Sequence, residues 1–329
     1  MKIFLLTGHR KSGTTLLHKL FDGSKGINIY PVDISLLYAY YPCYIKEKSF
    51  IEKTDRIRLV LTKSTREIEG MNIPNANKSF RAKEFIGLLF NNYKIQDLIE
   101  YDSIINALAE TWCLYSGSDN NLPIVFKETS QSIYANKIRH TGLNIKVIQL
   151  IRDPRDNYAA LKSGVDKHYS TIGEDQQKTL FSMINRARVD LMVAKELFVK
   201  EKWFKVVKFE DLVTKTEMTM RELSHFLKID FSEPMLRPTL LGKEYFGNSY
   251  DSSNISGVSS KNVGNWSSRI SKNEAAVIEF YMSDVMRFWG YKKCFNEFDS
   301  LDYFSEFYKW YNCEYFYYDA FLDKYQHEN

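Results

Sequence analysis

The sequence predicts an α/β domain of three layers, in which helices cover both faces of a central parallel sheet. Apolar runs with the length of buried strands support this prediction; they lie at residues 2–6, 27–30, 123–127, 146–151 and 204–209. Helical patterns follow most of these runs, and such alternation is typical of a parallel sheet. Because the carboxyl ends of parallel strands share the edge where ligands bind, we expect the residues after each run to converge on one site.

Composition and charge place the chain among globular proteins. Its 329 residues are 26% charged and 15% aromatic, which is not the composition of a disordered chain. The net charge of +4 is small beside 45 basic and 41 acidic side chains, so we expect no nucleic-acid partner. No apolar run is long enough to span a membrane, and the first residues do not resemble a signal peptide. The widely spaced cysteines favour reduced thiols in a cytoplasmic protein over the alternative of a long-range disulfide; they are Cys43, Cys113, Cys294 and Cys313.

The chain divides into a main domain at residues 1–295 and an extension at residues 296–329. Residues 45–115, between the second and third apolar runs, have a polar and mostly helical pattern. We interpret this segment as a helical insertion that either covers the active site or forms ordinary crossover helices. In the extension, aromatic residues recur every three or four positions and form one helical face, which indicates packing in the core or between the subunits of a homodimer.

Capping signals predict a helix near the end of the main domain. Ser271 stands three residues before Glu274, which is the spacing of a capping box. A periodic apolar pattern follows, and Gly290 can end the helix in a left-handed conformation. The predicted helix therefore lies between Ser271 and Gly290.

Residues 8–15, GHRKSGTT, follow the first apolar run and open a helical pattern. Gly8 and Gly13 keep the glycine spacing of the Walker loop, GxxxxGK[ST], but Thr14 stands at the Walker lysine position and the lysine comes earlier, as Lys11. Free backbone N–H groups at the start of a helix bind anions. We predict a phosphate-binding loop in a P-loop NTPase-like fold, but without the lysine that ATP hydrolysis uses; the alternative is a simple strand-to-helix turn.

A second cationic site follows the apolar run at 146–151. Arg152 comes directly after this run, and Pro154 can begin a helix. Arginine suits bidentate binding of phosphate, although pairing with Asp153 or Asp156 is a structural alternative. Two anion sites on one edge favour a nucleotide phosphorylated at both its 3′ and 5′ ends over ATP, which needs one phosphate site and magnesium.

Four motifs in order resemble those of the sulfotransferases that use 3′-phosphoadenosine 5′-phosphosulfate (PAPS). They are RKSGTT at 10–15, similar to the 5′-phosphosulfate loop; VIQLIRDPRDNYAALKS at 147–163, similar to the 3′-phosphate strand and helix; VVKFEDLV at 206–213, similar to the KYEDL element; and VGNWSSRISKNEAAVIEFYMSDVMRFWGY at 263–291, similar to the terminal GxW segment of bacterial members. The resemblance spans residues 2–291, but residues 45–115 and the extension have no counterpart in it.

The resemblance implies roles at the donor. Lys11 would contact the oxygen that bridges phosphate and sulfate, and Arg152 would hold the 3′-phosphate. Phe209, at the tyrosine position of the family, would pack near the adenine or in the core, and Lys261 would close over the donor with the loop before Trp266. The 5′-phosphosulfate would be bound by the residues of the loop, which are Arg10, Lys11, Ser12, Gly13, Thr14 and Thr15.

The sequence departs from the family pattern at two places. The family has a serine eight residues after the arginine, but this chain has Ala160, and we expect Ser163, one helical turn later, to take its place. The basic Arg-Lys-Gly of the closing loop is absent, and Lys261 is the cation that we expect to act there.

Transfer of a sulfuryl group to a hydroxyl needs a general base and no metal ion. Asp33 is the first candidate because it follows the second strand at the edge of the phosphate loop, although it could instead cap the next helix. Glu128 in FKETS is the second candidate, with Lys127 to assist it, and His9 and His18 are further alternatives. Lys11 and the helix N-terminus would stabilise the leaving oxygen.

The resemblance therefore implies a PAPS-dependent sulfotransferase that acts on a hydroxyl of a carbohydrate, a lipid or another small metabolite. Two other functions fit the same phosphate loop. An ATP-dependent small-molecule kinase would use the loop as a variant Walker motif, and a nucleotide-binding protein without catalytic activity would keep the loop without the base.

Overall fold

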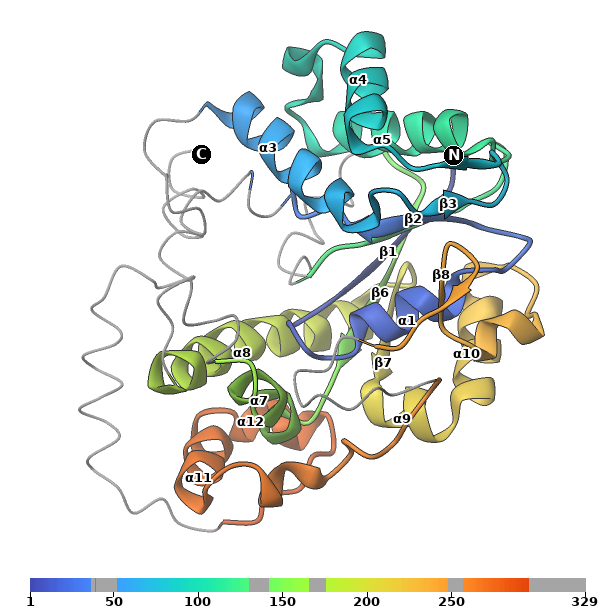
Figure 1. Cartoon of the computed structure of the whole chain (residues 1–329). Coiled ribbons are helices and arrows are strands. Elements are labelled where there is room, and N and C mark those ends of the chain that lie inside the picture. The colour runs from blue at the N-terminus through green and yellow to red at the C-terminus, as the bar shows by residue number, and fades with distance from the viewer. Residues whose placement is uncertain (37–38, 40–51, 130–141, 166–175, 248–256, 296–329) are drawn as a thin grey trace.

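A five-stranded parallel sheet forms the centre of the computed structural model, which describes residues 1–36, 39, 52–129, 142–165, 176–247 and 257–295 (Figure 1). The strands follow the order β2-β5-β1-β6-β7. They are β1 Ile3–Gly8, β2 Asn28–Asp33, β5 Ile124–Lys127, β6 Ile145–Ile151 and β7 Phe204–Lys208. The fold class and the five predicted strands are confirmed. Phe209 begins a helix instead of ending the last strand.

Alternate residues of the central strand face two separate cores. All six residues of β1 are buried. Ile3 and Leu5 belong to the larger core, whereas Phe4 and Leu6 belong to the smaller one. Because both faces of the sheet are covered, its strands are apolar on both sides and do not alternate with polar residues.

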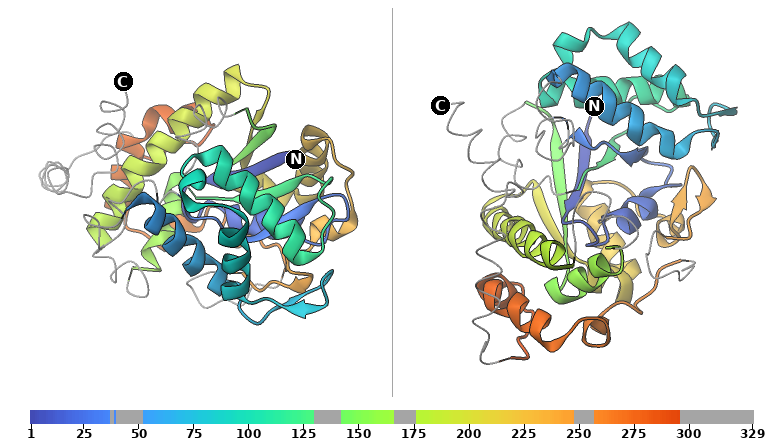
Figure 2. Two further views of the ribbon diagram at one scale, coloured as in Figure 1. Left: turned by 90° about the horizontal axis from the view of Figure 1, so that it is seen from above. Right: turned by 60° about the vertical axis from the view of Figure 1, so that its left-hand side comes forward.

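Helices cover the two faces as the three-layer prediction requires, and α1 and α8 lie on opposite sides of the sheet (Figure 2). The smaller core is covered by α1 Thr14–Phe21, α9 Phe209–Thr214 and α10 Thr216–Leu227. The larger core is covered by α3 Lys53–Thr65, α4 Ala82–Asn92, α5 Tyr101–Ser116, α7 Pro154–Lys162 and α8 Gln176–Lys200.

The segment between β2 and β5 is largely helical, as predicted, but it also contains a short hairpin. Its short elements are η2 Arg66–Ile68, β3 Asn72–Ile73, β4 Lys78–Ser79 and η3 Ile95–Leu98. Aromatic contacts attach the segment to the sheet, because the Tyr30 ring on β2 lies 5.8 Å from Trp112 and 6.2 Å from Phe85. The domain boundaries, and the role of residues 45–115 as a cover of the acceptor site, stay predictions.

The predicted helix after Ser271 is two helices, α11 Lys272–Tyr281 and α12 Ser283–Phe288, because the backbone leaves the helical conformation at Met282. The capping box is confirmed: Glu274 N donates to Ser271 Oγ at 3.1 Å, and Ser271 N donates to Glu274 Oε2 at 2.7 Å. Gly290 follows with a φ of +76°.

The last short elements are η6 Glu233–Leu236, β8 Thr239–Leu240, β9 Lys243–Glu244 and η7 Asn265–Ser268. The predicted aromatic extension at 296–329, and with it the expected homodimer contact, lies outside the described residues, as do Cys43 and Cys313. Cys113 and Cys294 are free thiols. Among the described helices, none combines the length and the apolar character needed to cross a membrane.

Replacing Ser271 with alanine should destabilise the protein. The substitution removes the acceptor for Glu274 N, and loss of such a cap lowers the free energy of unfolding by about 1 kcal/mol. Urea denaturation followed by circular dichroism measures the change. Ser267→Ala, at a nearby exposed position, is the control and should change stability by less than about 0.5 kcal/mol. Equal effects of the two substitutions would contradict the capping box.

Candidate functional site

A cavity of about 570 Å³ opens at the carboxyl edge of the sheet, between the phosphate loop, the ends of β2 and β5, the α7 segment and the loop before α11. Most of the predicted site residues line it, namely Arg10, Lys11, Gly13, Thr14, Thr15, Asp33, Arg152, Ser163 and Phe209. Three of them do not. Ser12 and Glu128 are buried, and Lys261 is exposed outside the lining residues.

The loop before α1 depends on backbone conformations that favour glycine. Gly8 and Gly13 have φ values of +150° and +101°, and Lys11 has a φ of +64°. A Cβ atom at Gly13 would lie 2.4 Å from Cδ2 of Phe209, so the close approach of this ring also requires glycine. Helix α1 begins at Thr14, and the N–H groups of its first turn have no carbonyl partner within the helix, which makes them donors for an anion.

Asn157 on α7 attaches the phosphate loop to the second cationic motif. Its Nδ2 donates to the Arg10 carbonyl at 2.8 Å, and its Oδ1 lies 2.7 Å from Nδ1 of His9. Burial, with the charges of Arg186 and Arg10, keeps the pKa of His9 well below its ordinary value. The neutral ring therefore donates from Nδ1 to Asn157. His9 does not line the cavity, so the structure does not bring this alternative base to the site.

Arg152 at the end of β6 joins the phosphate loop to the loop before α11. Its Nη1 donates to the Lys11 carbonyl at 3.0 Å, and its Nη2 donates to the Asn262 carbonyl at 2.8 Å. The guanidinium also lies 4.4 Å from the centroid of the Phe209 ring, an arrangement typical of a cation–π contact. Phe209 therefore lines the cavity and packs beneath this cation at the same time.

The carboxylates beside Arg152 have other partners. Asp153 pairs with Arg155 at 2.6 Å, and Asp156 accepts from the backbone N–H of Gly264 at 2.6 Å. Among the described ion pairs, none joins Arg152 to either carboxylate. Burial lowers the pKa of Arg152, which indicates that its charge would gain from an anion in the cavity.

Ser163 lines the cavity next to a cation that the sequence analysis did not consider. Nη2 of Arg269 lies 3.3 Å from Ser163 Oγ, which itself donates to the Ala160 carbonyl at 3.0 Å. Arg269 lines the same cavity, whereas Lys261 does not. The sequence did contain a signal for Arg269, because this residue lies within the GxW segment, three residues after Trp266.

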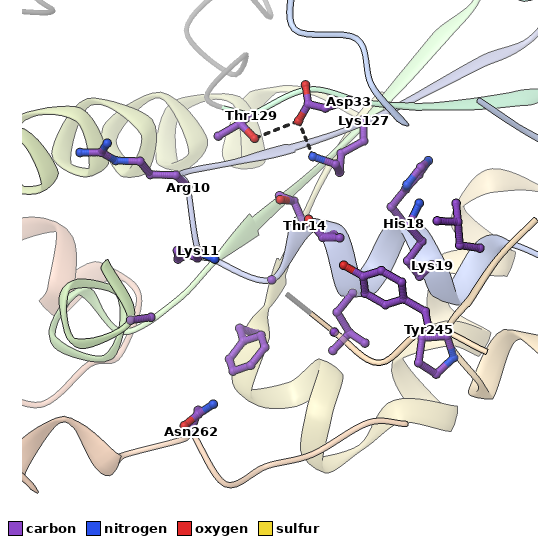
Figure 3. Close-up of a pocket in the computed structure, with 18 of the residues that line it drawn as sticks. Arg10, Lys11, Thr14, His18, Lys19, Asp33, Lys127, Thr129, Tyr245 and Asn262 are labelled. Carbon is purple, nitrogen blue, oxygen red and sulfur yellow. Dashed lines mark hydrogen bonds and ion pairs between the residues drawn. The ribbon is translucent and has the colours of Figure 1, made fainter. Parts of the chain in front are cut away.

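Asp33 meets Lys127 where β2 and β5 end (Figure 3). Lys127 Nζ and Thr129 Oγ1 donate to one oxygen of Asp33, the latter at 3.2 Å. The other oxygen accepts from the backbone N–H of Ser35 at 3.0 Å. Asp33 thus shapes the turn after β2 and lines the cavity as well. Thr129 was not predicted, and it stands two residues beyond the end of β5.

Further cavity residues come from α1 beyond its first turn, including the alternative base His18, and from the segment after β9. In Figure 3, His18, Lys19 and Tyr245 lie on the side of the cavity opposite Arg10 and Lys11. Arg10 extends toward α8, where its Nη2 donates to Ser182 at 3.1 Å. Within the described residues, no three histidine, cysteine or carboxylate side chains are grouped so that they could hold a metal ion.

Comparison with known proteins agrees with this geometry. The profile of the sulfotransferase family matches residues 3–233. The sulfotransferase domain from the curacin biosynthetic pathway has a similar fold, with a TM-score of 0.55, 15% identity, and coverage of 88% of this chain and 98% of that domain. The sulfotransferase domain of the Synechococcus PCC 7002 olefin synthase has a TM-score of 0.55, 18% identity, and coverage of 89% and 95%. No curated protein matches the chain.

Replacing Gly13 with alanine should distort the phosphate loop. The added Cβ would overlap the Phe209 ring, and the positive φ adds strain, so we expect the free energy of unfolding to fall by about 1–3 kcal/mol. Gly26→Ala is the matched control because a methyl group added at that position would meet no atom within 4 Å. Chemical denaturation of the two variants measures the difference. An unchanged stability of Gly13→Ala would contradict the loop geometry.

Proposed function

Because this chain belongs to the sulfotransferase family, we propose that it transfers the sulfuryl group of PAPS to a hydroxyl group of a small-molecule acceptor. One observation carries the proposal: the cation predicted for the 3′-phosphate, Arg152, is bonded to the carbonyl of Lys11 in the phosphate loop. Arg152 and the phosphate loop line one cavity, which supports a donor with phosphate groups at both ends.

The residues of the cavity fit the donor from end to end. The first turn of α1 would bind the 5′-phosphate through its free N–H groups, with Thr14 and Thr15 beside them. Arg152, Ser163 and Arg269 would hold the 3′-phosphate. In this arrangement, Arg269 would provide the cation that the closing loop of the family carries. Lys261 is exposed and does not line the cavity.

Lys11 would stabilise the leaving group. Bound PAPS supplies a sulfuryl group whose transfer leaves negative charge on the bridging oxygen. The Lys11 side chain lines the cavity at the phosphate loop, and the α1 N-terminus directs N–H groups toward the same place. One such donor typically contributes about 10²–10³ to the rate of group transfer.

Asp33 is the better placed of the two candidate bases. It lines the cavity, whereas Glu128 is 1% exposed and lies outside the lining residues. Lys127 and Thr129 hold one carboxylate oxygen in place, and the carboxylate would accept the proton of the acceptor hydroxyl. Lys127, which is also in the cavity, would assist by offsetting charge on the sulfuryl oxygens.

Binding of adenosine 3′,5′-bisphosphate (PAP), the donor product, tests the nucleotide assignment. By calorimetry, we expect PAP to bind more tightly than ATP with magnesium. Arg152→Gln should weaken PAP binding by roughly 10- to 100-fold, because a hydrogen bond to a charged group contributes about 1.5–3 kcal/mol. Arg221→Gln, which removes an exposed arginine on α10, should have no effect. Tighter binding of ATP would favour a kinase and would refute the proposal.

Substitution of Asp33 tests the base. We expect Asp33→Asn to lower the rate of sulfuryl transfer from labelled PAPS by about 10²–10⁴, since a positioned base contributes that much, and to leave PAP affinity within a few-fold of the wild type. Glu128→Gln is the parallel variant. If Glu128→Gln loses the activity and Asp33→Asn keeps it, the role of base passes to Glu128. If the wild type binds PAP but transfers no label to any hydroxyl, the chain is a binding protein.

A further inference from the structure

The wall of the cavity opposite Arg10 and Lys11 carries ionisable side chains that the proposed reaction does not use. Lys19 comes from α1 and Tyr245 from the segment after β9 (Figure 3). Glu67, from η2, lines the same cavity. Resting on the proposed function, we propose that Lys19 and Glu67 form a specificity subsite for a neutral, hydroxyl-rich acceptor such as a sugar. They bind hydroxyl groups adjacent to the one that is sulfated.

Lys19 is held at the edge of the cavity with hydrogen-bonding capacity to spare. Its Nζ donates to the Pro31 carbonyl at 2.7 Å, two residues before Asp33 on β2. It also lies 5.8 Å from the centroid of the Tyr245 ring. The side chain is 5% exposed. An ammonium group has three N–H donors, and among the described residues Nζ has this one acceptor, so two donors are available to a ligand.

Glu67 lines the same cavity as Lys19 and the proposed base. Its side chain is accessible to solvent and lines the cavity. Partial burial and the charge of Asp33 raise its pKa, whereas the charges of Lys127, Lys19 and Lys63 lower it. These interactions place the Glu67 carboxylate in the electrostatic field of both Asp33 and Lys19. Glu67 supplies acceptors where Lys19 supplies donors.

His18 adds a buried polar side chain to this wall. It is 0% exposed and lines the cavity, and its ring interacts with the backbone of Tyr30. Burial keeps its pKa well below the ordinary value, so the ring is neutral and provides one donor and one acceptor. The Tyr30 carbonyl can take the donor, which leaves the acceptor nitrogen for a ligand hydroxyl.

The balance of charge on this wall selects the class of acceptor. Two ammonium groups, Lys19 and Lys127, and two carboxylates, Asp33 and Glu67, line the cavity. Because these four formal charges cancel, an anionic acceptor would gain no net attraction from them, and an alkyl chain would remove water from the four charges without replacing its hydrogen bonds. A hydroxyl group can accept from Lys19 and donate to Glu67, and adjacent hydroxyls can do both at once.

Acceptor preference is the first test. Labelled PAPS is supplied with methyl β-D-glucopyranoside, its anionic glucuronide counterpart, p-nitrophenol or 1-octanol. We expect kcat/KM for the glucopyranoside to exceed the other three by about tenfold or more, as expected when polar groups of a site are left unpaired by the wrong ligand. Preference for the phenol, the alcohol or the glucuronide overturns the inference but leaves the proposed function intact. PAP binding without transfer to the glucopyranoside also overturns it, and loss of PAP binding instead refutes the proposed function.

Variants assign the preference to the two residues. Glu67→Gln and Lys19→Met should each raise the KM for methyl β-D-glucopyranoside by about tenfold and leave the KM for PAPS unchanged. Lys25→Met, at an exposed position outside the cavity, is the control and should change neither. A rise in the KM for PAPS alone would assign this wall to the donor and overturn the inference.

The pH dependence of KM separates binding by Lys19 from a structural effect. The pKa of Lys19 is lowered to about 8, and burial is the largest of the several causes of this shift. The charged and titratable groups around the ammonium are Asp22, Asp33, Glu67, Lys127, His18 and Tyr245. Above pH 8 the ammonium loses its proton, so the KM for the glucopyranoside should rise with pH in the wild type and stay flat in Lys19→Met. Equal profiles would contradict a role for Lys19 in binding.

Discussion

The site depends on a buried arginine that contributes its hydrogen bonds to backbone carbonyls. Arg152 joins the phosphate loop, through the Lys11 carbonyl, to the loop before α11, through the Asn262 carbonyl, and Phe209 supports it from below. The two carbonyl oxygens accept from Nη1 and Nη2, Nε has no partner among the described residues, and neither carbonyl neutralises the charge. A buried cation in this state would be stabilised by an anionic ligand.

Behind this arginine, a second buried network holds α7 in place. Arg155 pairs with Asp153 at 2.6 Å and with Glu279 of α11 at 2.6 Å, and its guanidinium lies 4.5 Å from the centroid of the Trp266 ring. Glu279 also accepts from the backbone N–H of Cys294 at 2.9 Å. The network ties the start of α7 to α11 and to the segment after α12. Removing one partner would leave an uncompensated buried charge, which is strongly destabilising.

The two halves of the cavity are built differently. The half proposed for the donor combines the phosphate loop with the turn that follows β6, and Asn157 is hydrogen-bonded to the loop. The half proposed for the acceptor combines single residues from α1, η2 and the segment after β9, around Asp33 and Lys127. Such a division would keep a donor in one geometry, while the opposite wall can change without disturbing the phosphate loop.

The sequence by itself determined the features that depend on neighbouring residues. Strand β1 is an apolar run, Gly8 and Gly13 mark the turn before α1, and Ser271 with Glu274 caps α11, because each involves contacts within a few positions of the chain. Arg152 was found for the same reason, since it directly follows β6. The helix break at Met282 was missed because the apolar pattern continues through it.

Only the tertiary structure decided which distant side chains share the cavity. Nothing local distinguishes Lys19 and Glu67 from other charged residues on helices, since their positions depend on how α1 and η2 pack around the sheet edge. The same packing separates Asp33 from Glu128, although both stand at strand ends. Short-range patterns set the backbone, whereas burial and proximity arise from contacts between segments far apart in the chain.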